Sequence, residues 1–397
     1  MKTGRTPWNI QILIYLLAFG SFYQQSVLMP VLPRFAGDMG LSVSMIGIAL
    51  AARFIVPAFF AAQIGSWTAQ FGLRRSLIWS SILTVATTPL YMLTDNIWVF
   101  LIAQVISGSL YMATWISSQT YATRVPDRDF VVGIFATITA VGMTVGPLVG
   151  GFALDHGGYN VAFIAYAAGA VLMGITALLL GNHAAGQPTE PKPRAKGQAR
   201  ELLSRPGIQA AFLFSFICLF MIGIRGNFLP LFLEERQMTA SAIGVILAAG
   251  SLGQSVIRPF TSVVLRASGL VVTMMIAAVI AILGLSIVPL TGAQWIMAAF
   301  VFVSGVGAGL HQSLGLVLLA ENTSDSERGY AVGLRATINQ VATAGAPVLA
   351  GFLGDALGMN AAFYVIGAAL LMSTYWLWKV LTRADNARKA KAVQAAA

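Results

Sequence analysis

The sequence predicts an all-α integral membrane protein with twelve transmembrane helices in two pseudo-symmetric six-helix bundles. Three observations predict this fold: a high apolar content, a series of apolar segments of bilayer length, and an internal repeat. Hydrophobic residues make up 57% of the 397-residue chain and charged residues only 10%, a composition unlike that of a soluble domain. The 40 glycines fit the same class, because small residues let helices approach closely in lipid.

Apolar segments of about 20 residues, the length that crosses a bilayer, define the expected helices. They lie at 9–31, 42–63, 75–93, 97–122, 130–154 and 160–181 in the first half, and at 207–233, 241–262, 271–290, 294–320, 330–353 and 359–381 in the second. The polar stretch 182–206 is rich in proline and lysine and predicts a cytoplasmic linker. The expected domains are therefore 1–181, the linker 182–206, 207–383, and a basic cytoplasmic tail at 384–397.

The second half of the chain repeats the first. Residues 133–163 match residues 333–363 at an offset of 200, with 13 of 31 positions identical. The same offset aligns Pro30 with Pro230, and an offset of 197 aligns Ile46–Ala52 with Ile243–Ala249. A parallel duplication in lipid is typical of transporters whose halves rock about a central binding site.

The basic residues predict the orientation. With the N-terminus inside, 18 lysines and arginines fall in cytoplasmic segments, whereas only Arg34 and Arg236 fall outside. The positive-inside rule then places both termini in the cytoplasm and the protein in a cytoplasmic (inner) membrane. The net charge of +10 is therefore a topology signal, and no nucleic-acid partner is expected. The expected partners are a small-molecule substrate and the lipid bilayer, and we expect a monomer.

The fifth predicted helix carries the most specific motif. Residues 142–151 read GMTVGPLVGG, a full match to the pattern GxxxGPxxGG. Gly142, Gly146 and Gly150 form a bare ridge at four-residue spacing, and Pro147 bends the helix. We expect the ridge to pack on the opposite half and to slide as access alternates; the alternative is a close-packing face without motion.

Two six-helix halves joined by a basic loop resemble the major facilitator superfamily over essentially the whole chain. The helix-5 motif resembles that of the twelve-helix drug:proton antiporter group, which implies alternating access with the proton as coupling ion. Other family motifs are altered. The loop after the second helix keeps Gly65, Gly72 and Arg74, but Ala69 replaces the family's aspartate, and Gln104 replaces the arginine of the fourth helix. The proton-linked role of that arginine is therefore not transferred, and the cytoplasmic latch is expected to be weak or rebuilt.

Four arginines fall within the predicted spans, whereas the 14 acidic residues fall in loops or at helix ends. An arginine inside a membrane is a functional-site candidate. Arg53 and Arg225 are predicted to line a water-filled cavity. Arg335 is expected to form a structural or gating pair, with Glu321, Glu327 or the loop between the fourth and fifth helices within its reach. Arg258, near the inner end of the eighth helix, fits a gate or a ligand role.

The repeat also indicates which residues face each other. Gln25 and Arg225 align at the 200 offset, each five residues before a proline. The predicted substrate-binding residues are Gln24, Gln25, Arg53, Tyr111, Trp115, Arg225, Asn227, His311 and Gln312. The predicted gating or packing residues are Gly65, Gly72, Arg74, Gly142, Gly146, Pro147, Gly150, Gly151, Arg258, Glu321 and Arg335. For the aromatic residues and His311, ordinary helix packing is an equal alternative.

The predicted cavity is aromatic, rich in amides and net positive. Arginine matches carboxylate, sulfonate and phosphate groups. The first hypothesis is a secondary active exporter of an amphipathic anionic or zwitterionic molecule, such as a siderophore, an organic acid or a drug. Its coupling proton would be carried by His311, by a gate acid such as Glu321, or by the substrate.

Two other hypotheses stay open: proton-coupled uptake of an organic anion, and a membrane receptor or scaffold that does not transport. The chain has no G-x4-G-K-[ST] loop and no catalytic constellation, and its single cysteine, Cys218, excludes a cysteine-based metal site. We therefore expect no enzyme activity, no cofactor and no metal.

Overall fold

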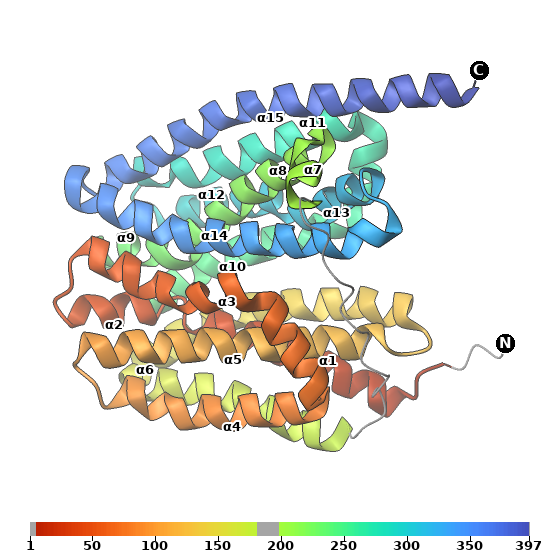
Figure 1. Ribbon diagram of the computed structural model, residues 1–397. Helices are drawn as coiled ribbons and strands as arrows, with labels where there is room; N and C mark the ends of the chain where they lie inside the picture. The colour runs from red at the N-terminus through yellow and green to blue at the C-terminus, as the bar shows by residue number, and fades with distance from the viewer. Residues whose placement is uncertain (1–4, 181–197, 397) are drawn as a thin grey trace.

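The computed structural model describes residues 5–180 and 198–396, and every regular element in these ranges is a helix. The helices form two groups, one built from α1–α6 and the other from α8–α15 (Figure 1). The first group comprises α1 (Trp8–Val27), α2 (Leu32–Asp38), α3 (Val43–Phe71), α4 (Leu73–Met92), α5 (Ile97–Thr123) and α6 (Arg128–Leu180). The second comprises α8 (Pro206–Gly223), η1 (Ile224–Phe228), α9 (Leu229–Glu235), α10 (Ala240–Val256), η2 (Arg258–Phe260), α11 (Thr261–Ser286), η3 (Val288–Leu290), α12 (Gln294–Gly309), α13 (His311–Glu321), α14 (Asp325–Leu357) and α15 (Met359–Ala396).

Eight helical segments in the described part of the chain are long and apolar enough to cross a membrane. Two of them, Phe130–Leu180 and Ala240–Leu290, contain a glycine with non-helical backbone angles, Gly158 and Gly269. Residues 182–197 of the expected linker lie outside the described residues. The rest of it includes the short helix α7 (Gln198–Ser204), and α15 continues through the expected tail to Ala396.

The repeat extends to the backbone turns. Six residues of the described chain have φ in the left-handed region, and they form three pairs: Gly40 with Gln237 and Gly72 with Gly269 at the 197 offset, and Gly158 with Gly358 at the 200 offset. Glycine dominates these positions because it has no Cβ to clash in this conformation. The turns that reverse the chain therefore sit at equivalent places in both halves.

The two halves meet along two pairs of helices. Helix α3 packs along α14, and α10 packs along α6. A Cβ added at Gly47 would clash with the carbonyl of Pro347, and one at Gly244 would clash with the carbonyl of Pro147. The two contacts are related by the repeat, and both need a bare glycine because the helices touch at backbone distance.

The predicted partner of the helix-5 ridge is wrong. Gly142, Gly146 and Gly150 face α1 of their own half, where an added Cβ would clash with α1 backbone atoms or a side chain. Gly151, one residue further on, faces a carbonyl of α10 in the other half. The ridge therefore closes a packed interface within the first half. The contact between halves uses the neighbouring side of the same helix, which carries Gly151 and the carbonyl of Pro147.

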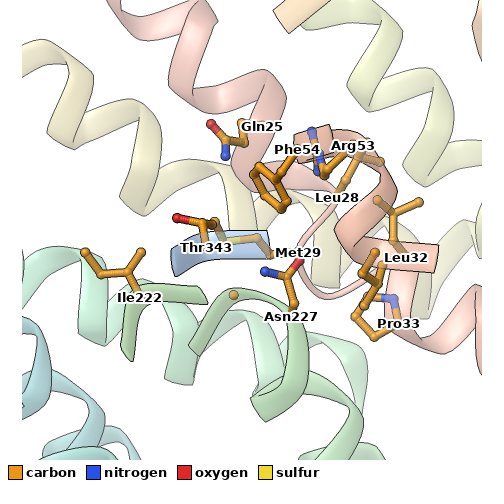
Figure 2. Close-up of a pocket in the computed structure, with 12 residues that line it drawn as sticks. Gln25, Leu28, Met29, Leu32, Pro33, Arg53, Phe54, Ile222, Asn227 and Thr343 are labelled. Carbon is orange, nitrogen blue, oxygen red and sulfur yellow. The ribbon is translucent and has the colours of Figure 1, made fainter. Parts of the chain in front are cut away.

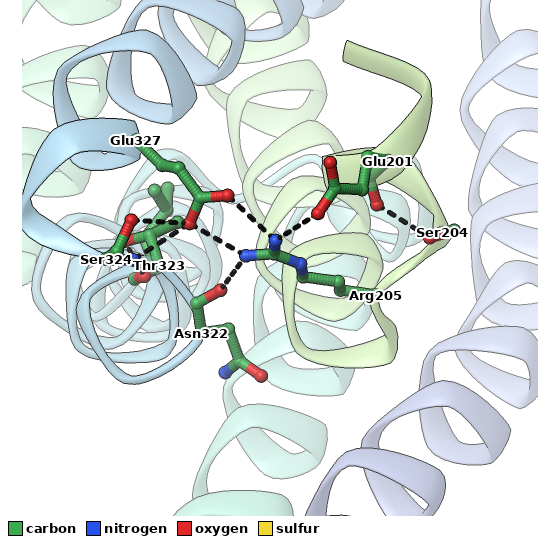
Figure 3. A network of polar contacts seen from close by, with 8 residues as sticks. Glu201, Ser204, Arg205, Asn322, Thr323, Ser324 and Glu327 are labelled. Carbon is green, nitrogen blue, oxygen red and sulfur yellow. Dashed lines mark hydrogen bonds and ion pairs between the residues drawn. The ribbon is translucent and has the colours of Figure 1, made fainter. Parts of the chain in front are cut away.

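A polar network joins α7 and the start of α8 to the loop before α14 (Figure 3). Both terminal guanidinium nitrogens of Arg205 donate to the carboxylate of Glu327, at 2.9 and 2.8 Å, and Nη2 also donates to Glu201 at 2.7 Å. The hydrogen bond from Arg205 lowers the pKa of Glu327 to about 2. Asp127, which aligns with Glu327 at the 200 offset, is held instead by Thr6 and by Gln11.

Candidate functional site

A pocket lies between the two halves, and its empty space, including the solvent at its open side, is about 410 Å³. Figure 2 shows Gln25, Arg53 and Phe54 on one side of it and Ile222 and Asn227 on the other. Its walls come from α1, α2 and the turn between them, and from α3, α8, η1 and α14. The lining residues are Gln25, Leu28, Met29, Leu32, Pro33, Leu50, Arg53, Phe54, Ile222, Gly226, Asn227 and Thr343.

Broken helices shape this pocket on both sides. Helix α1 ends at Val27, and a turn precedes α2 at the position of Pro30. In the second half, the segment Ile224–Phe228 before Pro230 is a π-helix, in which the N–H of Leu229 reaches the carbonyl of Ile224. Proline lacks the backbone N–H that a continuous helix needs, and single π-turns are frequent at functional sites. Pro30 and Pro230 therefore lie where the regular α-helical hydrogen bonding is interrupted, at equivalent points of the two halves.

Arg53 on α3 is the charged residue of the pocket lining. It is only 6% exposed, and no hydrogen bond or ion pair joins it to another described residue. Its guanidinium carbon lies 5.8 Å from the ring centroid of Phe54, within the range of a cation–π contact. A Cβ at Gly108 would clash with the Arg53 carbonyl, so close packing on α5 holds the backbone in place. The pocket thus contains one cation and no carboxylate in its lining.

Gln25 and Asn227 also line the pocket, so the structure brings together three of the predicted substrate-binding residues. Arg225 lies elsewhere. It is 3% exposed, donates a hydrogen bond of 3.0 Å to Gln254 and packs over Gly250. The repeat aligns Gly250 with Arg53 and Arg225 with Gln25. Each half therefore carries one buried arginine in this region, Arg53 on α3 and Arg225 in η1. Only Arg53 lines the pocket.

The other predicted substrate-binding residues are not in the pocket lining. Tyr111 and Trp115 pack edge-on against Phe22, with ring centroids 6.5 and 4.7 Å apart. Gln24 is buried near Gly169 of α6, and Gln312 is exposed. The contacts of Tyr111 and Trp115 with Phe22 are those of ordinary helix packing, the alternative that was expected for the aromatic residues.

Arg335 and His311 belong to one buried cluster in the second half. Arg335 donates to the hydroxyl of Ser215 at 2.9 Å and to the carbonyl of His311 at 3.0 Å. The expected pairing of Arg335 with an acid is wrong, because Arg335 faces α8 and α13 whereas Glu327 is held by Arg205. The Nδ1–H of His311 points to the carbonyl of Ala308, 2.6 Å away.

The remaining predicted gate residues lie toward the end of the bundle that carries the chain termini. The Nε atom of Arg258 is buried without a partner in the described chain, and Glu321 is exposed at the end of α13. Arg74 donates to the carbonyls of Ala177 and Leu178 and so caps the end of α6. Gly72 takes the left-handed turn before α4, and Gly65 faces α5.

At the opposite end of the bundle, which carries α2 and α9 (Figure 1), two aspartates join the halves. Asp155 of α6 accepts hydrogen bonds from the first N–H groups of α10, and Asp355 of α14 accepts them from the first N–H groups of α3. An ion pair of 3.3 Å between Arg34 and Glu234 also crosses between the halves here. A carboxylate at a helix N-terminus is stabilised by the unpaired N–H groups and by the helix dipole.

Sequence reasoning missed these two aspartates, although a signal was present. Asp155 and Asp355 are one of the identical pairs of the repeat, and the helix starts that they contact also align, at the 197 offset. The next N–H of each helix is capped by a side chain of its own half, Ser42 for α3 and Thr239 for α10.

Comparison with known proteins decides the family. The family model "Major Facilitator Superfamily" matches residues 14–224 and 211–397, which together span nearly the whole chain. The chain belongs to the major facilitator superfamily. It is an integral membrane transporter and not an enzyme.

Relatives within the superfamily include efflux proteins. The chain is 22% identical over 388 residues to the multidrug resistance protein MdtG of Citrobacter koseri, covering 92% of this chain and 93% of the relative. It is 27% identical over 156 residues to the class E tetracycline resistance protein of Escherichia coli, covering 38% and 37% of the two chains.

Solved superfamily structures share the fold. The nucleoside transporter NupG has a TM-score of 0.75 at 14% identity, with 94% of this chain and 99% of that chain covered. A mutant form of the peptide transporter POT in complex with sulfate has a TM-score of 0.78 at 13% identity, with 94% of each chain covered.

Proposed function

We propose that this protein exports an amphipathic anionic or zwitterionic small molecule by alternating access. One observation carries the proposal: Arg53 is a buried cation in the pocket between the halves, without a hydrogen bond or ion pair to a described residue. Burying an unpaired charge is costly. A ligand that brings a carboxylate, sulfonate or phosphate to Arg53 removes that cost, whereas a cation adds repulsion. The export direction is supported by the similarity to MdtG.

The proposed arrangement in the membrane has twelve spans. Gly158 and Gly269 divide the two longest apolar segments, and α4 and α14 complete the two sets of six. We place both termini in the cytoplasm of an inner-membrane protein, on the basis of the basic residues. The α2/α9 end, where Asp155 and Asp355 join the halves, then lies on the outer side. We propose that the protein acts as a monomer.

A proton is the proposed coupling ion. No carboxylate lines the pocket, so the proton travels on the acid group of the substrate, binds at His311, or binds at a gate acid such as Glu321. Proteoliposome transport under an imposed pH gradient tests these routes. Flux that is unchanged in His311→Gln excludes the histidine route, and lost flux with intact binding assigns the proton to His311.

The function is tested by comparing metabolites in cells and medium with and without the gene, and then by measuring transport of the accumulated compound. Arg53→Gln should weaken binding of an anionic substrate by about 10- to 150-fold, the effect of losing one charge-assisted contact of roughly 1.5–3 kcal/mol. Arg53→Lys should lose less, because it keeps the charge but not the planar fork. An exported compound that is a cation, or affinity that is unchanged in Arg53→Gln, would contradict the proposal.

A further inference from the structure

The polar groups of the pocket are divided between the two halves of the protein. The first half contributes Arg53 and Gln25, and the second half contributes Asn227 and Thr343. The remaining lining is apolar apart from the glycine. Each polar group has a definite capacity to donate or accept hydrogen bonds, and the bonds that it already makes within the protein show which capacity is left for a ligand.

The second half offers acceptors. The side-chain Nδ2 of Asn227 donates to the carbonyl of Gly223 at 3.0 Å, and this bond orients the amide because a carbonyl accepts only from the NH2 group. The Oδ1 atom of Asn227 has no partner in the described chain. The hydroxyl of Thr343 uses its one hydrogen to donate to the carbonyl of Asn339 at 2.8 Å. Thr343 therefore offers a ligand only oxygen lone pairs, whereas Asn227 offers the lone pairs of Oδ1 together with the second N–H of its amide.

The first half offers donors. A guanidinium has five N–H groups and no acceptor, and those of Arg53 make no hydrogen bond to a described residue. Gln25 likewise makes none, and its amide can donate through nitrogen as well as accept through oxygen. Between the two polar walls lie Leu28, Met29, Phe54 and Ile222, which form the apolar middle of the pocket.

We infer that the ligand carries an acid group at one end and a hydrogen-bond donor at the other, as in an amphipathic zwitterion or hydroxy acid. This inference rests on the proposed function and narrows its substrate class. The acid group faces Arg53 and Gln25, the ammonium, hydroxyl or amide N–H group faces Asn227 and Thr343, and an apolar body fills the middle. A plain organic anion forms hydrogen bonds only with the first half. It donates none to the acceptors of the second half, which lowers its affinity.

Four probes of similar size test the inference: 3-(4-hydroxyphenyl)propionate, 3-(4-aminomethylphenyl)propionate, 3-phenylpropionate and phenethylamine. The first two carry an acid group at one end and a donor at the other, the third carries only the acid, and the fourth only the donor. Binding is measured by titration calorimetry on the full chain in lipid nanodiscs. The first two probes should bind about 3- to 10-fold more tightly than 3-phenylpropionate, the effect of one net hydrogen bond. Phenethylamine should bind most weakly, because it meets Arg53 without an acid group.

Variants assign the preference to the second half. Thr343→Val and Asn227→Leu should remove the preference for 3-(4-hydroxyphenyl)propionate while 3-phenylpropionate binds as before. The matched controls are Thr374→Val and Asn322→Leu, since these side chains make the same kind of bond to their own helix, at 2.6 and 2.8 Å, outside the pocket. Both controls should keep the preference. Arg53→Gln should weaken all three carboxylates while the ratio between them is retained.

The outcomes separate the inference from the proposed function. If Arg53→Gln weakens the carboxylates but the wild type does not favour 3-(4-hydroxyphenyl)propionate over 3-phenylpropionate, the inference is overturned and the proposed function stands. If the wild type binds the carboxylates and Arg53→Gln binds them equally well, the proposed function falls, and the inference falls with it. A preference that survives both Thr343→Val and Asn227→Leu, or failure of all four probes to bind the wild type, would also overturn the inference.

Discussion

The carboxylate of Asp155 accepts a hydrogen bond of 2.7 Å from the backbone N–H of Ser241, across the boundary between the two halves of the transporter. The repeat places an equivalent bond of 2.9 Å between Asp355 and Ser44. In both cases a carboxylate of one half occupies the N-terminus of a helix of the other half. The α2/α9 end is therefore closed by two symmetric contacts between a charge and a helix terminus.

Asp155→Asn together with Asp355→Asn should open this end. Asparagine keeps an acceptor but loses the charge, and losing a helix-capping interaction costs about 0.5–2 kcal/mol. The closed population should fall by about 2- to 30-fold for each contact. Electron–electron distances between spin labels on the two halves measure this shift. Asp38→Asn is the control, because Asp38 bonds Tyr159 within its own half. Unchanged distances in the double variant would contradict a latch at these residues.

The two aspartate contacts at the closed end should be insensitive to pH in the physiological range. Hydrogen bonding by Ser44, through its side chain and its backbone N–H, lowers the pKa of Asp355 below its ordinary value of 3.8. The lowered pKa belongs to the closed state, so the contact is fully present above the ordinary pKa and is lost as the pH falls below it. In a Glu234→Gln background, which removes the Arg34–Glu234 ion pair at the same end, spin-label distances should therefore stay constant between about pH 6 and 8 and lengthen only in strong acid. Opening that titrates near neutral pH would contradict this assignment.

Larger side chains at the glycines between the halves should shift the transporter from its closed to its open state without unfolding it. Gly47→Val and Gly244→Val place a side chain against the carbonyls of Pro347 and Pro147, contacts that exist only while the halves are closed at this end. We expect opening at the α2/α9 end with a nearly unchanged melting temperature.

Gly146→Leu is the contrasting variant, because Gly146 packs on α1 within the first half. A side chain there overpacks a fixed interface, which typically costs about 1–3 kcal/mol. Its melting temperature in detergent should fall. A stable Gly146→Leu protein with altered spin-label distances would show that the ridge lies at the moving interface between the halves.

Replacing Arg335 should lower the stability of the protein, whereas replacing Arg53 should weaken ligand binding. Arg335→Met removes the donor for the His311 carbonyl and a partner of Ser215. Leaving such buried groups unpaired costs about 1–3 kcal/mol, so the melting temperature should fall. Arg53→Gln leaves no described residue without a partner and should retain the wild-type melting temperature while ligand binding weakens. A melting temperature that falls in Arg53→Gln as much as in Arg335→Met would place Arg53 in the scaffold.

Much of the fold was predictable because it depends on patterns local in the sequence. Apolar length and the repeat predicted a helical membrane protein in two related halves, and the helix-5 motif predicted the transporter family. The position of a residue along a helix did not predict which neighbouring helix that residue contacts. Gly142, Gly146 and Gly150 were therefore assigned to the wrong partner, although Gly151 beside them does contact the other half.

The sequence by itself determined the class of protein and the presence of four arginines within the apolar spans, since charge and hydropathy are properties of the residues. Only the tertiary structure decided which of these arginines is available to a ligand. Arg225 and Arg335 find neutral oxygen partners on neighbouring helices, at Gln254 and Ser215, and Arg53 finds none in the described chain. The availability of a buried charge depends on partners that lie close in space and far apart in the sequence, and packing of the helices brings them together.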